Sequence, residues 1–362
     1  MAFPAFLRTI SNRLVADPSF QRWAARIWPL SLVARAQARA LFDLSAAVAL
    51  GQTLAAAIEL GLLDAVAEAP QDMAALAARL KLPADGLACL IVAAEGIGLV
   101  ARLPDGRVAL GMRGAAVRAH PGIAAMVAHH RMLLVDLADP ARLFREAPGG
   151  GALAAFWTYA GAAEAEAAAA AAPYSALMAA SQPMVSEQAL ASYPFGRHRA
   201  LLDIGGGSGA FLEAIGAAHP HLALTLFDLP AVIPHAEARL KGRARLVAGH
   251  FLADPLPGGA DLVSLVRILH DHDDPVVEAL LARVRAVVAP GGRLIIVEPM
   301  AGTPGAETVG TYFSLYLRAM GSGRPRTAAE LGALLEGAGF GKVRERPTPL
   351  PLVARLLEAQ AL

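Results

Sequence analysis

The C-terminal half of the chain alternates apolar runs with helical stretches, and this pattern restricts the fold more than any other feature. Five runs are predicted strands: residues 200–205, 222–229, 244–251, 260–269 and 292–299. Nearly continuous apolar strands separated by helices are typical of a parallel sheet that helices cover on both faces. The sequence therefore predicts a doubly wound α/β domain, which binds its ligands at the carboxyl ends of the strands.

A glycine-rich loop, "GGGSGA", follows the first predicted strand. Gly205, Gly207 and Ala210 match a dinucleotide-binding fingerprint, and Asp228 ends the next strand about 20 residues on. Asp203 argues against a dinucleotide, because a carboxylate beside the turn repels a pyrophosphate and attracts an ammonium. S-adenosylmethionine carries an ammonium and a sulfonium but no phosphate. We expect this cofactor, with an NAD-dependent dehydrogenase as a remote alternative.

Composition excludes several classes of protein. A net charge of +1 in 362 residues gives no basic surface for nucleic acid. The single cysteine, Cys89, excludes an internal disulfide framework and a cysteine-rich zinc site, and fits a cytoplasmic protein. We expect Cys89 to be buried. Polar residues interrupt every long apolar stretch, for example Asp43, Gln52 and Glu59 within 41–63, so we predict no membrane-spanning helix.

The N-terminal region divides into three predicted segments. Residues 1–40 form an amphipathic helical arm that sets six arginines among aromatic and aliphatic residues, which suits packing on a second subunit or an anionic membrane surface. Residues 41–119 have the helix and hairpin order of a winged helix. Its candidate recognition helix, 84–98, has no Lys or Arg, which disfavours a DNA-binding regulator. Residues 120–192 are a helical linker and substrate-pocket segment, and 193–362 the cofactor domain.

Four ordered motifs carry a family resemblance. "LLDIGGGSGAF", "LFDLPAVI", "VRILHDHDDP" and "APGGRLIIVEP" resemble the small-molecule O-methyltransferases related to caffeate and acetylserotonin O-methyltransferases. The resemblance implies a Rossmann-like class I methyltransferase domain, preceded by an α-helical winged-helix domain that forms a homodimer.

Within the family, "FDLPAVI" and "RAMGSGRPRTAAELGALLEGAGF" are most similar to bacterial carotenoid enzymes. That similarity implies methyl transfer to the tertiary 1-hydroxyl of a hydroxylated acyclic carotenoid, by an enzyme in peripheral contact with the inner or photosynthetic membrane. A bacteriochlorophyll precursor and an aromatic polyketide remain alternative acceptors.

The resemblance also implies a set of cofactor contacts, with Asp228 on the ribose hydroxyls and Leu229 beside the adenine. The family's Gly-Asp-Phe/Met motif reads Gly249-His250-Phe251 here, so Phe251 can stack on adenine while the acidic partner is missing. The predicted cofactor residues are Asp203, Gly205, Gly207, Asp228, Leu229, Gly249, His250, Phe251 and Arg267.

His270 follows the fourth predicted strand and is the expected general base, with a helix-capping histidine as the structural alternative. Asp271 is expected to orient the imidazole, and Glu298 matches the first of two glutamates that flank the base in plant relatives. The second position is Pro325. We predict no metal, because neighbouring residues of "HDHDD" point apart and methyl transfer from a sulfonium needs no Lewis acid. We assign His272 no role.

The acceptor is expected to lie among large apolar and aromatic side chains. The predicted wall residues are Phe156, Trp157, Met178, Met184, Tyr312, Phe313, Tyr316 and Met320.

Overall fold

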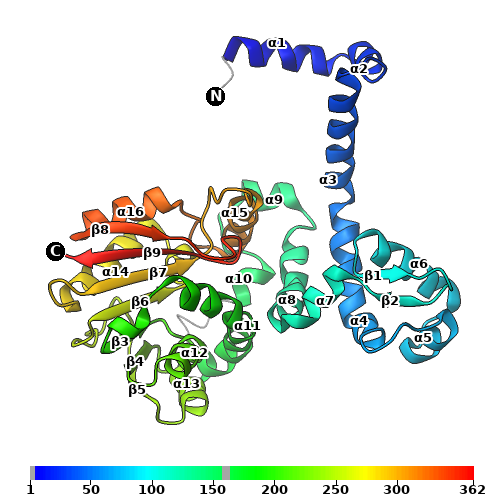
Figure 1. Cartoon of the computed structure of the whole chain (residues 1–362). Helices are drawn as coiled ribbons and strands as arrows, with labels where there is room; N and C mark the ends of the chain where they lie inside the picture. Colours follow the sequence, from blue (N-terminus) through cyan, green and yellow to red (C-terminus); the bar gives the residue numbers. More distant parts are fainter. Residues whose placement is uncertain (1–4, 157–163) are drawn as a thin grey trace. The chain divides into compact units, whose positions relative to one another are not determined.

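A computed structural model describes residues 5–156 and 164–362, so Trp157 lies outside the described residues. The chain divides into two compact units, Met1–Arg118 and Ala119–Leu362. We call them unit 1 and unit 2 and describe each by itself. Figure 1 shows the elements of both.

Unit 2 is built on a seven-stranded sheet in the order β5-β4-β3-β6-β7-β9-β8 (Figure 1). The five predicted strands are present and pair in parallel. They are β3 (Ala200–Ile204), β4 (Ala223–Asp228), β5 (Ala244–Ala248), β6 (Leu262–Val266) and β7 (Arg293–Glu298). The order reverses between β3 and β6, which places a ligand crevice at the carboxyl ends of these strands.

Two strands that the sequence did not predict extend the parallel sheet at one edge. β9 (Arg355–Ala361) pairs antiparallel with both β7 and β8 (Phe340–Arg346). Neither strand has a continuous apolar run. β8 lies at the sheet edge, and only its first residue, Phe340, is buried. β9 carries charged side chains that pair within the sheet, as Arg355 does with Glu345.

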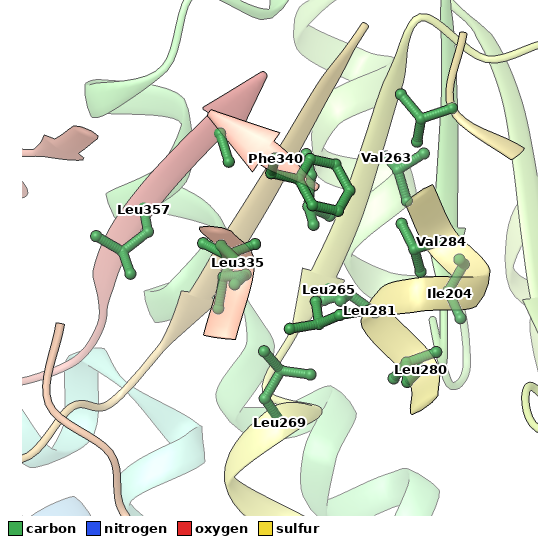
Figure 2. Close-up of a cluster of buried hydrophobic side chains, with 14 of the residues drawn as sticks. Ile204, Val263, Leu265, Leu269, Leu280, Leu281, Val284, Leu335, Phe340 and Leu357 are labelled. Atoms are coloured by element: carbon green, nitrogen blue, oxygen red, sulfur yellow. The ribbon is translucent and has the colours of Figure 1, made fainter. Parts of the chain in front are cut away.

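Helices cover both faces of the sheet. On one face, α14 (Asp274–Val287) and α16 (Ala328–Gly337) pack against β3, β6 and β7, and Figure 2 shows this cluster of buried hydrophobic side chains. On the other face lie α12 (Ala210–Ala218), α13 (Ile233–Leu240) and the C-terminal part of α11 (Glu164–Ser192). Close packing in these two cores fixes the positions of the strand ends and of the polar residues on them.

A smaller group of helices in unit 2 supplies a third buried cluster, formed by side chains of α8, α10 and α15. The remaining elements of unit 2 are α8 (Pro121–Asp136), α9 (Pro140–Arg145), α10 (Ala152–Phe156), α15 (Thr308–Met320) and the 3-10 turns η2 (Phe195–Arg197) and η3 (Leu269–Asp271).

Unit 1 has the predicted order of helices followed by a hairpin. Its elements are α1 (Ala5–Ala16), α2 (Pro18–Ala24), α3 (Leu30–Glu59), α4 (Leu62–Ala65), α5 (Met73–Leu80), α6 (Ala84–Gly96), β1 (Val100–Arg102), β2 (Val108–Leu110) and α7 (Met112–Ala119). The expectation that Cys89 is buried is wrong, since it is exposed. Leu87, Ile91 and Ala94 form the buried face of α6, and Cys89 lies off that face.

The helix α3 departs from the sequence prediction in two ways. It runs without a break through residue 40, where the arm was expected to end, because no proline or glycine interrupts it before Gly51. Among the described residues it is also long and apolar enough to cross a membrane by length and composition, although polar residues were expected to interrupt this stretch; that no helix spans a membrane stays a prediction. Helices that pack on protein share this length and composition.

Candidate functional site

A cavity of about 250 Å³ opens at the carboxyl ends of β3, β4 and β6. All nine predicted cofactor residues line it, together with Asp271 and residues of α11. Its location follows from the topology, because the strand order reverses beside β3.

The glycine loop between β3 and α12 forms one wall through its backbone. Gly205 and Gly207 have φ values of +71° and +58°, a left-handed conformation that glycine adopts without steric cost. A Cβ at Gly206 would lie 2.7 Å from Asp203 Oδ2. Side chains are therefore excluded here, and a ligand can approach the backbone closely.

Asp203 at the end of β3 is fully buried and only partly satisfied. Its Oδ1 accepts a hydrogen bond of 2.6 Å from Ser264, whereas Oδ2 has no hydrogen-bond partner in the structure. Burial and, to a smaller extent, the charge of Asp228 raise the pKa of Asp203 to about 7, although the hydrogen bond from Ser264 acts in the opposite direction. A cationic group in the cavity would supply the missing partner.

Asp228 at the end of β4 is held by two backbone amides. Its Oδ2 accepts from Gly207 N and its Oδ1 from Leu229 N, each at 2.7 Å. Burial raises its pKa to about 6, while these two bonds act in the opposite direction. Each carboxylate oxygen keeps a second lone pair, so the group can also accept from a vicinal diol.

The altered motif after β5 closes the side of the cavity next to Asp228. His250 N donates to Asp254 Oδ2 at 2.8 Å, and Leu252 N donates to His250 Nδ1 at 3.2 Å. Asp254 thus binds the backbone of its own loop and is not a lining residue. Phe251 lines the cavity and packs edge-on against His272, which suits stacking on an aromatic base.

Arg267 links β6 to α11. It has a φ of +58°, an unusual conformation for a non-glycine residue, and its Nη1 donates to Ser181 Oγ at 2.8 Å. Sequence reasoning missed the lining residue Gln182, whose buried Nε2 has no partner in the structure. The signal available was the polar pair "SQ" inside an alanine-rich helix.

His270 lies on the turn η3, with a carboxylate near each ring nitrogen. Nδ1 is 3.1 Å from Glu298 Oε2, and Nε2 is 3.2 Å from Asp271 Oδ1. Burial lowers the pKa of His270, but the charges of Asp271 and Glu298 outweigh it, so the pKa lies above the usual value. The pKa of Asp271 also lies above its usual value, in this case because burial disfavours the charged carboxylate. Asp271 lines the cavity, whereas His270 is not a lining residue.

The predicted acceptor wall divides in the structure. Met178 and Met320 line the cavity, and Tyr312, Phe313 and Tyr316 of α15 form an aromatic group. Phe313 packs edge-on against the His270 ring, at 5.5 Å between centroids. Met184 is half-buried on α11 and lines neither the cavity nor this group.

Two histidines of α8, absent from the sequence prediction, hydrogen-bond the tyrosines of α15. His129 Nε2 lies 2.8 Å from Tyr316 Oη, and His130 Nε2 lies 2.7 Å from Tyr312 Oη. The predicted wall residue Phe156 packs on the His129 ring. Burial, aided by His130, lowers the pKa of His129 to about 4, so the His129 imidazole is neutral at pH 7. The adjacent histidines in an apolar helix were the available signal.

No group of three or more His, Cys, Asp or Glu that could hold a metal ion occurs among the residues that the structure describes.

Residues 132–341 match the family of O-methyltransferase domains. The chain belongs to this family. The O-methyltransferase is 43% identical to demethylspheroidene O-methyltransferase of Cereibacter sphaeroides, over 98% of this chain and 95% of the relative. The protein of the same name from Rhodobacter capsulatus is 41% identical, over 91% of this chain and 84% of that relative.

Solved structures agree with this assignment. The O-methyltransferase resembles CalO1, a methyltransferase of calicheamicin biosynthesis solved with S-adenosylhomocysteine, with a TM-score of 0.76 and 26% identity over 90% of this chain and 98% of the other. Human N-acetylserotonin methyltransferase with S-adenosylmethionine shares the fold, with a TM-score of 0.73 and 23% identity over 90% and 97%. The predicted family, fold class and cofactor are confirmed: the protein is an S-adenosylmethionine-dependent O-methyltransferase with a small-molecule acceptor.

Proposed function

We propose that the enzyme methylates the tertiary hydroxyl of a hydroxylated acyclic carotenoid, with His270 as general base. The contact of His270 with Glu298 beside the cofactor cavity carries the catalytic part of the proposal. The acceptor class is supported by similarity to the two demethylspheroidene enzymes and by the aromatic group of α15 next to His270.

The cavity residues fit the cofactor by charge and shape. The unpartnered Oδ2 of Asp203 suits the methionine ammonium, and Asp228 suits the ribose diol. Phe251 offers a ring face to the adenine, and Leu229, Gly249 and His250 line the same wall. The bound cofactor supplies an electrophilic methyl group on a sulfonium.

His270 accepts the proton of the acceptor hydroxyl. In the neutral imidazole, Nδ1–H donates to Glu298, which fixes the tautomer and leaves Nε2 as the base. The acceptor hydroxyl takes the place of Asp271 at Nε2. Its proton passes to Nε2 as the hydroxyl oxygen bonds to the methyl carbon and the carbon–sulfur bond breaks. Because a tertiary alcohol is a weak acid, proton transfer and methyl transfer are concerted. In-line alignment of the hydroxyl oxygen with the methyl group supplies much of the acceleration.

A flat aromatic polyketide is a second candidate acceptor. The chain is 31% identical, over 84% of its length, to the 3-hydroxy-5-methyl-1-naphthoate 3-O-methyltransferase of Streptomyces sahachiroi, 90% of which is covered. The two His–Tyr pairs of α8 and α15 offer polar atoms that a hydroxylated ring system could bind.

A single assay distinguishes the acceptors. The purified full chain is incubated with methyl-labelled S-adenosylmethionine and either a 1-hydroxylated acyclic carotenoid in detergent or a hydroxynaphthoate. We expect the label in a methoxy-carotenoid. Label in the naphthoate alone would assign the aromatic acceptor, and label in neither would contradict both proposals.

We also propose a homodimer formed through unit 1. Five exposed apolar side chains lie on one face of α3 by helical spacing: Leu30, Val33, Leu41, Leu44 and Val48. A second copy would cover this face. Leu44→Glu should therefore shift the mass measured by light scattering from dimer to monomer, and an unchanged mass would contradict the proposal.

We propose in addition that the arm contacts the cytoplasmic side of an anionic inner or photosynthetic membrane. Residues 1–40 hold six arginines against one acidic residue, Asp17, and Trp23 and Trp28 are exposed. The full chain should sediment with anionic vesicles and not with neutral ones. Replacement of Arg22 and Arg26 by Gln should weaken this binding, and equal sedimentation with both lipids would contradict the proposal.

A further inference from the structure

A segment between α15 and α16, residues 322–326, wraps around the turn that carries His270. We call it the clamp segment. Its Arg326 has no exposed surface and is the largest fully buried side chain of the described residues. A buried guanidinium requires compensating acceptors, and the identity of those acceptors indicates what the residue does.

Arg326 binds the carbonyls on both sides of His270 and Asp271. Nη1 donates to Leu269 O at 2.7 Å, and Nη2 donates to His272 O at 2.8 Å. Asp274, at the start of α14, balances the charge by accepting from Arg326 Nε at 2.9 Å. Charge-assisted bonds of this kind are about twice as strong as neutral ones.

Glu298 binds the same turn through its amides. Its Oε2 accepts from Leu269 N at 3.1 Å and from His270 N at 3.3 Å, besides facing the His270 ring. The amides of the turn are thus bound by an anion on β7 and its carbonyls by a cation of the clamp segment. Such opposed contacts restrict how far His270 can move relative to Glu298.

The rest of the clamp segment follows the turn closely. Ser322 Oγ donates to Asp271 O at 2.9 Å, and Gly323 N donates to Asp273 Oδ1 at 2.9 Å. A Cβ on Gly323 would overlap the His270 carbonyl oxygen, and its φ of +82° also favours glycine. Ser322 lines the cavity as well, so the clamp segment touches both the cofactor wall and the catalytic turn.

We propose that Arg326 is a positioning residue for methyl transfer, which holds the His270 turn in register with Glu298 and the cavity through the Leu269 and His272 carbonyls. This inference rests on the proposed role of His270 as base. It also gives a role to the sequence around Pro325, which stands where plant relatives have a second glutamate. In this chain the neighbouring guanidinium of Arg326 binds the turn.

Arg324 is a matched control in the same network. It donates to the side chains of Asp274 and Glu330, is half-buried, and makes no hydrogen bond to the carbonyls of the turn. Its loss should weaken the Asp274 network without releasing the turn.

The test compares R326Q, R326K and R324Q in the full chain. Small misplacements of a catalytic group cost up to about 100-fold in rate, so we expect kcat to fall about 10- to 100-fold in both Arg326 variants. The acceptor KM and the S-adenosylhomocysteine Kd should stay within about 3-fold of wild type, since the cofactor wall is intact. R324Q should keep kcat within about 2-fold.

A spectroscopic readout distinguishes positioning from general destabilisation. NMR titration should show that the pKa of His270 falls toward its ordinary value in folded R326K, because the ring moves away from its carboxylates, and stays unchanged in R324Q. Equal kcat losses in R324Q and R326K, or an unchanged kcat and His270 titration in folded R326K, would overturn the proposal.

A milder variant covers the case in which the Arg326 variants fail to fold. S322A removes a third contact of the clamp segment with this turn, the bond to the Asp271 carbonyl, and should lower kcat about 3-fold with only a small decrease in Tm. An unchanged kcat in S322A would mean that the contacts of the clamp segment do not position the turn, and would overturn the proposal. If the wild type itself methylates no acceptor, the proposed function fails, and the His270 titration still tests the role of the clamp segment.

Discussion

The two sides of the site are built differently. The cofactor side consists largely of backbone and strand-end residues, where the loop after β3 and Asp228 after β4 are set by the sheet itself. The proposed acceptor side consists of side chains from α8, α11 and α15, which are far apart in the sequence. We therefore expect the shared fold to fix the cofactor side and helix side chains to determine the acceptor.

Of three substitutions that test this comparison, Glu298→Gln is expected to have the largest effect, because it alters the turn that carries His270 and leaves the cofactor wall intact. Loss of the charge removes stabilisation of the imidazolium, so kcat should fall about 100-fold. Because Glu298 raises the pKa of His270, the acidic limb of the kcat profile should move to lower pH. A kcat and pH profile like those of the wild type would show that Glu298 does not act on His270.

Asp203→Asn tests the cofactor side alone. Loss of a charge-assisted bond to the ammonium should weaken S-adenosylhomocysteine binding about 30-fold by calorimetry. The pKa of Asp203 in the free protein is about 7, and a bound ammonium lowers it. Wild-type affinity should therefore decrease as pH falls through about 7, whereas the variant should lose this step and keep only the titration of Asp228 near pH 6. Parallel profiles would exclude Asp203 as the titrating group.

Tyr312→Phe is expected to have the smallest effect and concerns only the acceptor side. The variant loses the bond to His130, which should cost about 1 kcal/mol of unfolding free energy. The acceptor KM should rise by less than about 5-fold, with cofactor affinity unchanged. A loss of cofactor affinity would mean that the two sides are not separable.

The same difference explains what the sequence predicted. That the nine predicted cofactor residues line one cavity was predictable, because each lies at or just after a strand end or in a glycine turn, and local patterns define such positions. Arg326 and the His129–Tyr316 pair were not, because they meet partners more than 50 residues away. β9 was not predicted because Arg355, Glu358 and Gln360 interrupt its apolar pattern, although most of the strand is buried.

His270→Ala tests the central claim most directly, by measuring methyl transfer to the acceptor and S-adenosylhomocysteine binding in one protein. Removal of the general base should lower kcat by about 1,000-fold, while the cofactor Kd stays within about 2-fold because His270 does not line the cavity. Turnover equal to that of the wild type, in a variant that still binds the cofactor, would contradict the account.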